Sequence, residues 1–225
     1  MNWRIALPGW GVRAEIFQPL QQALPHAGWQ AWEWSQTQPE AQIEDWAGRL
    51  PATDGVLYAW SLSGVLALDL ARHPQVRALV LLASSPCWSA TTDWPGMAAA
   101  RWQAFRTQLV HAPQSAAREF LALQAHGDVA AARLRRRLQP LQWPQQQAPE
   151  LLDALLWDRR AALAELSLPI LVVLAAADAL LPVAQAPFLR RLGLEVIVLP
   201  GSHLLPWSPQ LAPALAEWEA RHGLA

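Results

Sequence analysis

The chain has 225 residues, of which 53% are hydrophobic and 16% are charged, so it can bury one sizeable core and has an ordinary globular composition. Its formal net charge of −1 excludes an overall electrostatic field that would attract nucleic acid or an anionic membrane surface. No apolar run reaches the roughly 18 residues of a transmembrane helix, and the amino-terminal segment is too short for a secretory signal, so we expect a cytoplasmic protein. We also expect it to be a monomer.

Short apolar runs typical of buried parallel strands recur along the chain. They are Trp3–Leu7, Val56–Trp60, Ala78–Ala83, Ile170–Ala175 and Val196–Leu199. Each run is followed by turn or polar residues and then by a helical pattern. This alternation predicts an α/β fold, in which a mostly parallel central sheet is flanked by helices on both faces.

The segment between the third and the fourth run has a different character. Residues 94–165 are rich in alanine, leucine, glutamine and arginine at helical spacing, and contain no strand candidate. A stretch of this length between strands indicates a helical insertion rather than a structureless loop. We therefore predict one domain, with a core of residues 1–93 and 166–225, a helical lid at about 94–165, and a loop between lid helices at 142–149.

A serine stands where the second apolar run changes into a helical pattern. In the sequence YAWSLSG, Ser61 has the small residues Ala59 and Ser63 two positions before and after it, followed by Gly64. A sharp strand-to-helix turn of this kind exposes a nucleophilic hydroxyl, and small neighbours let the strand and helix approach each other. A serine that only caps the helix is the alternative interpretation.

Two further polar residues follow the last two apolar runs. Asp178 comes just after residues 170–175, and His203 comes just after residues 196–199. Ser61, Asp178 and His203 thus occur in the order of a nucleophile, an acid and a base at the carboxyl ends of strands. A helix cap at Asp178 and a loop role for His203 are the alternatives, and the remaining histidines do not directly follow a late strand.

Six segments that together span nearly the whole chain carry a family resemblance. They are LPGWGVRAEIF at 7–17, WSLSG at 60–64, HPQVRALVLLASSPCWSATTDWPGM at 73–97, FLALQ at 120–124, ADALLP at 177–182 and GSHLLPWSP at 201–209. Through them the chain resembles the α/β-hydrolase family, and within it the pimeloyl-[acyl-carrier protein] methyl ester esterases of biotin biosynthesis. The resemblance implies a serine carboxylesterase that acts on the methyl ester of pimeloyl-acyl-carrier protein.

The resemblance also implies roles for individual residues. The backbone N–H groups of Trp10 and Leu62 correspond to the donors that stabilise the oxyanion in this family. Its substrate-binding positions correspond to Trp10, Leu62, Phe120, Leu121, Ala122, Leu123, Gln124 and His203. An ordinary role in the core of the lid is the alternative for residues 120–124.

The chain departs from the family pattern near the first strand. Pro8 stands where relatives usually have a histidine before the oxyanion-loop glycine, and WEWSQTQPEAQ at 32–42 replaces a glycine-rich loop of many relatives. We expect no leading hairpin before the first strand and a shorter sheet edge. Trp32 and Trp34 alternate in this segment, and burial in the core is the default expectation for them.

Arginines are concentrated in the predicted lid. Arg133, Arg136 and Arg137 fall at helical positions i, i+3 and i+4 and therefore on one face. Since an acyl-carrier protein is acidic, this face is a candidate docking surface for it. A solvated helix face is the alternative, because the lid also contains several acidic residues.

Several functions are compatible with this pattern of residues. The alternatives to the methyl esterase are another hydrolase on the same scaffold, such as a short-chain esterase, thioesterase or C–C bond hydrolase, or a non-catalytic binding module. The proposed chemistry requires no metal or other cofactor. Cys87 is the only cysteine, so no internal disulfide forms, and we expect a small buried side chain rather than a nucleophile.

Overall fold

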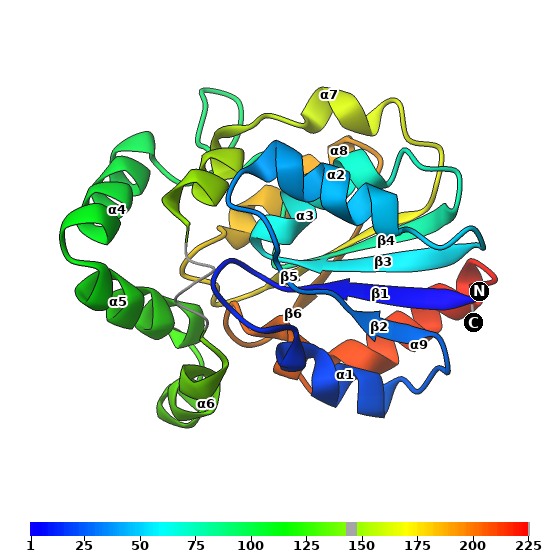
Figure 1. Ribbon diagram of the computed structural model, residues 1–225, viewed down its shortest axis with the longest axis horizontal. Coiled ribbons are helices and arrows are strands. Elements are labelled where there is room, and N and C mark those ends of the chain that lie inside the picture. Colours follow the sequence, from blue (N-terminus) through cyan, green and yellow to red (C-terminus); the bar gives the residue numbers. More distant parts are fainter. Residues whose placement is uncertain (143–147, 225) are drawn as a thin grey trace.

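The computed structural model describes residues 1–142 and 148–224. Within these residues, six strands form one sheet in the order β2-β1-β3-β4-β5-β6 (Figure 1). The strands are β1 (Trp3–Leu7), β2 (Trp29–Ala31), β3 (Gly55–Trp60), β4 (Val76–Leu82), β5 (Ile170–Ala175) and β6 (Glu195–Leu199). All neighbouring strands in this sheet are parallel.

The predicted α/β fold is confirmed, and all five predicted strands are present with shifts of at most two residues at their ends. The edge strand β2, which has three residues and pairs with β1 alone among the described residues, is not one of the predicted strands. Two of its residues are exposed, so it lacks the apolar run that identifies the buried strands. A strand this short has no readable periodicity.

Helices cover both faces of the sheet because alternate residues of each strand point to opposite faces. In β3, Leu57 and Ala59 pack into one core cluster, whereas Val56, Tyr58 and Trp60 pack into the other. The first cluster lies under α2 (Pro39–Arg49), α3 (Leu62–Leu70), α7 (Arg160–Leu163) and α8 (Ala186–Arg191), and the second lies under α1 (Gln18–Ala23) and α9 (Leu211–Arg221) (Figure 1).

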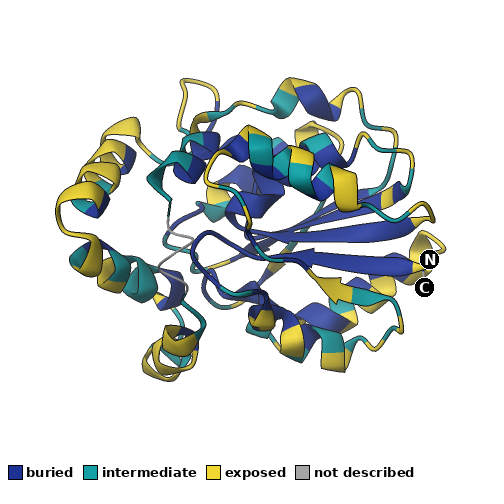
Figure 2. Cartoon of the chain, in the orientation of Figure 1, coloured by how far each residue is buried: buried dark blue, intermediate teal, exposed yellow. Residues whose placement is uncertain are grey.

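Three helices lie beyond the carboxyl ends of the strands. They are α4 (Ala99–His111), α5 (Pro113–Ala125) and α6 (Ala131–Leu138), all between β4 and β5 in the chain (Figure 1). Figure 2 shows exposed outer faces on these helices beside the buried strands. They occupy part of the segment for which we predict a lid. The predicted loop at 142–149 falls mainly on residues 143–147, which lie outside the described residues.

Short 3-10 helices complete the described secondary structure. They are η1 (Ala14–Phe17), η2 (Gln139–Leu141), η4 (Pro149–Leu156), η5 (Val183–Gln185) and η6 (Leu205–Trp207). In the parts of the chain that the structure describes, no helix has the length and apolar character needed to cross a bilayer.

Candidate active site

Ser61 occupies a strained turn between β3 and α3. Its backbone has φ 61° and ψ −126°, a conformation that residues other than glycine seldom adopt. Ala59 and Ser63 are fully buried at the turn. A Cβ atom on Gly64 would lie 2.2 Å from the Ser84 hydroxyl oxygen, so only glycine fits there. The small residues around Ser61 are therefore required by close packing.

The side chains of Ser61, His203 and Asp178 form one hydrogen-bonded chain. The Ser61 Oγ lies 2.8 Å from Nε2 of His203, and Nδ1 of His203 lies 2.7 Å from Oδ2 of Asp178. An ionised carboxylate only accepts hydrogen bonds, so a neutral imidazole carries its proton on Nδ1 and leaves Nε2 free to accept from the hydroxyl. This arrangement can take a proton from Ser61 as its oxygen attacks a carbonyl carbon.

The carboxylate of Asp178 is fixed in its orientation by the backbone that follows it. Its Oδ1 accepts hydrogen bonds from the N–H groups of Leu180, at 2.8 Å, and Leu181, at 3.0 Å. Asp178 therefore accepts hydrogen bonds from the backbone that follows it, as a capping residue does, and also binds His203. One oxygen holds the turn, which leaves the other directed at the imidazole.

The loop after β1 lies directly against the turn at Ser61. A Cβ atom on Gly9 would lie 3.1 Å from the Ser61 Cβ. The indole N–H of Trp34 donates to the carbonyl groups of Pro8 and Gly9, at 3.1 Å each, and the Ser63 hydroxyl lies 2.8 Å from the carbonyl of Leu7. These contacts fix the loop after β1, although Pro8 stands where relatives are expected to have histidine.

Leu62 directly follows Ser61 in the chain, and Trp10 directly follows Gly9, which lies against the Ser61 side chain. Leu62 is the first residue of α3, so its N–H is one of those that make no intrahelical hydrogen bond. Trp10 is buried in the loop after β1, and its indole N–H donates to the carbonyl of Ala148 at 3.0 Å. The structure therefore brings the backbone of both predicted donor residues to the same edge of the sheet as Ser61.

The predicted acyl-binding segment at residues 120–124 lies in α5, beside the loop that contains Trp10. The rings of Phe120 and Trp10 meet edge to face with centroids 5.3 Å apart. Phe120 and Leu123 line a cavity of about 160 Å³ together with Leu180, two residues after Asp178. Most of its walls are apolar, and Arg101, Gln108 and Glu119 also line it. Leu121 and Ala122 are half-buried in the same helix.

Gln124 is buried, and neither its amide oxygen nor its amide nitrogen has a hydrogen-bond partner among the described residues. A buried amide without partners costs about 1–3 kcal/mol. Such an amide in a predicted substrate-binding segment is a candidate contact for a polar group of a ligand.

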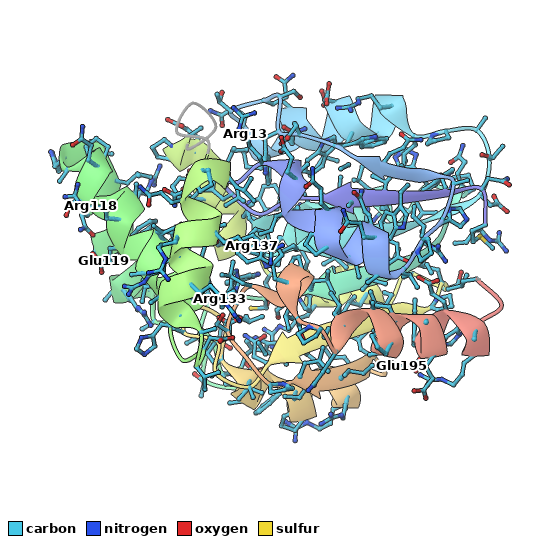
Figure 3. The ribbon with its side chains drawn as sticks, turned by 90° about the horizontal axis from the view of Figure 1, so that it is seen from below. Arg13, Arg118, Glu119, Arg133, Arg137 and Glu195 are labelled. Carbon is cyan, nitrogen blue, oxygen red and sulfur yellow. The ribbon has the colours of Figure 1, made fainter. Side chains whose placement is uncertain are left out.

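The candidate docking arginines lie on α6. Arg133, Arg136 and Arg137 are exposed, and Arg133 and Arg137 lie one helical turn apart (Figure 3). The Arg137 guanidinium stacks over the ring of Trp207 at 4.3 Å. Arg133 lines a groove of about 520 Å³ between α6 and the loop after β6, whose other walls include Leu205 and Trp207.

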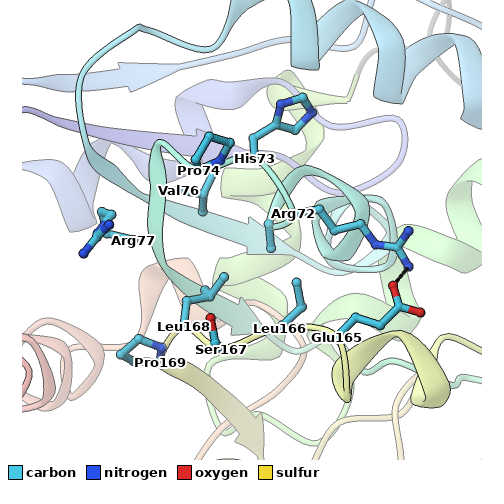
Figure 4. A pocket seen from close by; sticks show the side chains of 11 residues that line it. Arg72, His73, Pro74, Val76, Arg77, Glu165, Leu166, Ser167, Leu168 and Pro169 are labelled. Carbon is cyan, nitrogen blue, oxygen red and sulfur yellow. Dashed lines mark ion pairs between the residues drawn. The ribbon is translucent and has the colours of Figure 1, made fainter.

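A groove of similar size lies at the opposite edge of the sheet, where the strands begin (Figure 4). It has a volume of about 540 Å³, and two of the charged residues that line it, Arg72 and Glu165, pair with each other at 2.9 Å. None of the predicted site residues lines it. The groove therefore has no part in the candidate site, which the hydrogen bonds of Ser61, His203 and Asp178 identify.

Trp34, Trp60 and Trp88 lie near the site, although the sequence predicts no site role for them. Trp34 and Trp32 are buried as expected, but Trp34 also holds the loop at Pro8. The rings of Trp60 and Trp88 lie beside the imidazole of His203, with centroids 5.5 Å and 6.1 Å away. Only their proximity in the fold indicates these roles, since the sequence has 14 tryptophans.

Cys87 is buried, as expected from the sequence. Burial raises the pKa of its thiol, and the nearby carboxylate of Asp158 raises it further. The neutral thiol is a poor nucleophile.

The sequence matches the Alpha/beta hydrolase family over residues 3–216. A pimeloyl-[acyl-carrier protein] methyl ester esterase from Aromatoleum aromaticum is 34% identical over 214 residues, covering 82% of this chain and 83% of that protein. The protein of the same description from Serratia marcescens is 31% identical over 194 residues, covering 79% and 76%.

Solved structures with low sequence identity share the fold. A bromoperoxidase from Bacillus anthracis superimposes with a TM-score of 0.82 at 15% identity, covering 98% of this chain and 92% of that one. An esterase from Exiguobacterium antarcticum gives 0.77 at 15% identity, with coverage of 96% and 91%.

Proposed function

The chain belongs to the α/β-hydrolase family, and we propose that it hydrolyses the methyl ester of pimeloyl-acyl-carrier protein in biotin biosynthesis, with Ser61, His203 and Asp178 as its catalytic triad. The chain is a carboxylic ester hydrolase, as the family and the relatives described as esterases indicate. The hydrogen-bonded chain from Ser61 through His203 to Asp178 is the observation that carries the proposed mechanism.

In the first half of the reaction, the Ser61 oxygen attacks the ester carbonyl as Nε2 of His203 takes the hydroxyl proton. The negative charge that develops on the carbonyl oxygen is stabilised by the backbone N–H groups of Trp10 and Leu62. The tetrahedral intermediate collapses as the bond to the methoxy oxygen breaks, and the imidazolium gives its proton to that oxygen, which leaves as methanol. Asp178 stabilises the imidazolium throughout.

In the second half, water attacks the acyl group that is now attached to Ser61. His203 takes a proton from this water, and the second tetrahedral intermediate releases the carboxylic acid as the proton returns to Ser61. The chain's own groups supply each proton transfer.

The acyl chain of the substrate fits the apolar surroundings of α5 in this proposal. Phe120 and Leu123 contact its methylene groups in the cavity of about 160 Å³ that they line, and Leu121 and Ala122 belong to the same helix. The unpartnered amide of Gln124 binds a carbonyl oxygen of the acyl group or of the carrier arm. In this role α4–α6 form a lid over the carboxyl edge of the sheet, and residues 1–93 and 166–225 form the core.

The exposed arginines of α6 are the proposed docking surface for the acidic carrier protein. Arg133, Arg136 and Arg137 have no carboxylate within ion-pair distance among the described residues, so they are available to an external anion. Replacing all three with alanine should raise KM for a carrier-bound ester at least about tenfold and leave the hydrolysis of p-nitrophenyl butyrate unchanged, since charge complementarity governs encounter. Equal losses with both substrates would exclude docking at this face.

The substrate is tested by measuring which bond is cleaved in the methyl ester of pimeloyl-acyl-carrier protein. Release of methanol with the thioester intact supports the proposal, whereas release of the free carrier thiol identifies a thioesterase. Ser61→Ala should reduce methanol release by about 10⁴-fold or more. Growth of a biotin-requiring strain that lacks its own methyl esterase then tests the place of the reaction in biotin biosynthesis, which we assign to the cytoplasm.

A further inference from the structure

Trp60 joins three segments of the candidate site, two through its side chain and one through its backbone. It directly precedes Ser61 at the end of β3, and it is only 1% exposed. An indole is large and has few rotatable bonds, so a buried one holds its neighbours in a fixed arrangement.

The first contact is with the loop that carries His203. The Trp60 indole N–H donates a hydrogen bond of 2.8 Å to the backbone carbonyl of His203. The same indole packs against the imidazole ring, with centroids 5.5 Å apart and planes inclined by 45°. One side chain therefore restrains both the backbone and the ring of His203.

The second contact is with the loop after β1. A Cβ atom on Gly9 would lie 2.8 Å from both Cε3 and Cζ3 of Trp60, so the loop passes directly over the six-membered ring. The indole thus fixes how closely the loop that includes Trp10 approaches β3. The backbone of Trp60 leads directly into Ser61 and so fixes the position of that residue.

We propose that Trp60 is a positioning residue that fixes the imidazole of His203 and the loop at residues 8–10 relative to the Ser61 hydroxyl. This inference rests on the proposed function, in which His203 is the base and the N–H of Trp10 faces the oxyanion. Nucleophile, base and oxyanion donor come from three segments far apart in the chain. A displacement of about 1 Å among such groups can lower the rate about 10²-fold.

The N–H contact is tested with two variants of Trp60. Trp60→Phe removes the N–H and part of the ring. Incorporation of 3-benzothienylalanine at position 60 keeps the shape of the indole but replaces the N–H with sulfur, so it separates the hydrogen bond from the packing. For both variants we expect kcat for p-nitrophenyl butyrate to fall at least about tenfold, with KM changed less than about threefold, because the loss affects alignment rather than ground-state binding.

Trp3→Phe is the matched control. Trp3 is also buried, and its indole N–H also donates to a backbone carbonyl, that of Thr53 at 2.5 Å, but it lies where the strands begin. The control should lose similar thermal stability and keep the wild-type kcat. A second readout is the low-field proton resonance of the His203 Nδ1–H, which should shift or broaden in the Trp60 variants and stay unchanged in Trp3→Phe.

The outcomes separate this inference from the proposed function. If Ser61→Ala leaves ester hydrolysis intact, the proposed triad is wrong. If Ser61→Ala abolishes hydrolysis but the benzothienylalanine protein has the kcat of Trp3→Phe and an unchanged resonance, the triad stands and the positioning role of the Trp60 N–H is wrong.

Discussion

At the scale of single residues, the turn at Ser61 depends on a positive φ angle and on small, closely packed side chains around it. The positive φ of Ser61 turns its hydroxyl away from α3 and toward His203. Ser63 occupies the position of the second glycine in the common G-x-S-x-G turn. Its hydroxyl lies within hydrogen-bond distance of two carbonyl groups, those of Leu7 and Trp60, at 2.8 and 2.9 Å. The hydroxyl therefore ties β1 to β3 at the site.

The carboxylate of Asp178 should matter for turnover far more than for folding. In Asp178→Asn, the amide oxygen can still accept the N–H groups of Leu180 and Leu181, while the amide nitrogen faces His203 and favours the wrong tautomer. We expect kcat for p-nitrophenyl butyrate to fall about 10³–10⁴-fold. A thermal midpoint close to that of the wild type, measured by circular dichroism, is the control, and a wild-type kcat would contradict the triad.

Gly64 should tolerate no side chain while Ser84 is present. Gly64→Ala places a methyl group 2.2 Å from the Ser84 hydroxyl oxygen and 2.5 Å from its Cβ, so α3 must move. We expect a loss of about 1–3 kcal/mol in the free energy of unfolding, measured by urea denaturation. The double variant with Ser84→Gly should recover most of this loss, and an undiminished loss would show that another contact is responsible.

At the scale of elements, α9 is tied to the sheet by a buried polar cluster. Glu219 in α9 forms an ion pair with Arg4 of β1 and accepts a hydrogen bond from the Tyr58 hydroxyl of β3. All three side chains are buried. The cluster joins the carboxyl-terminal helix to the two strands that lead to the loop at Gly9 and to Ser61.

Removing only one partner of this cluster should destabilise the fold. Glu219→Ala leaves the Arg4 guanidinium buried without its carboxylate, and we expect a loss of about 3–5 kcal/mol in the free energy of unfolding by urea denaturation. The triple variant Arg4→Met, Tyr58→Phe, Glu219→Leu removes all the polar groups together and should be much closer to the wild type. If the triple variant were as unstable as Glu219→Ala, unpaired charge would not be the cause.

At the scale of the whole molecule, the candidate site lies at the junction between the sheet and the helices beyond its carboxyl edge. Ser61 is buried, and His203 is completely buried. The imidazole is covered by Trp60 on β3 and by Trp88 after β4. The polar chain of the site thus lies in an environment of low dielectric constant, where hydrogen bonds are stronger than in water.

The stability of the fold should decrease at alkaline pH through Tyr58. Burial raises the pKa of the Tyr58 hydroxyl well above its ordinary value, and the charge of Glu219 raises it further. Because the folded-state pKa exceeds the unfolded value of about 10, the contribution of Tyr58 to stability is complete below that pH and is lost as the pH rises through the folded-state pKa.

Tyr58 is the only tyrosine, so the ultraviolet absorbance of tyrosinate reports on this residue alone. We expect tyrosinate to form only as the protein unfolds, in the same pH interval in which the circular dichroism signal is lost. Tyrosinate that forms near pH 10 in a protein with native circular dichroism would contradict a buried, carboxylate-bonded hydroxyl.

The sequence by itself determined the buried strands and the order of Ser61, Asp178 and His203 at their carboxyl ends. Apolar runs and the residues that directly follow them are local patterns, and parallel strands bring such ends to one edge. The resemblance of several segments to a known family added the expected acyl-binding and oxyanion residues. Short, half-exposed β2 escaped detection because it has no such pattern.

Only the tertiary structure decided which side chains hold the site together. The bond between Trp60 and His203 joins residues 143 positions apart, and the pair of Arg4 and Glu219 joins residues 215 positions apart. The unpartnered amide of Gln124 is likewise visible only after folding. Each of these depends on burial and distance between separate segments, which no local pattern in a single sequence encodes.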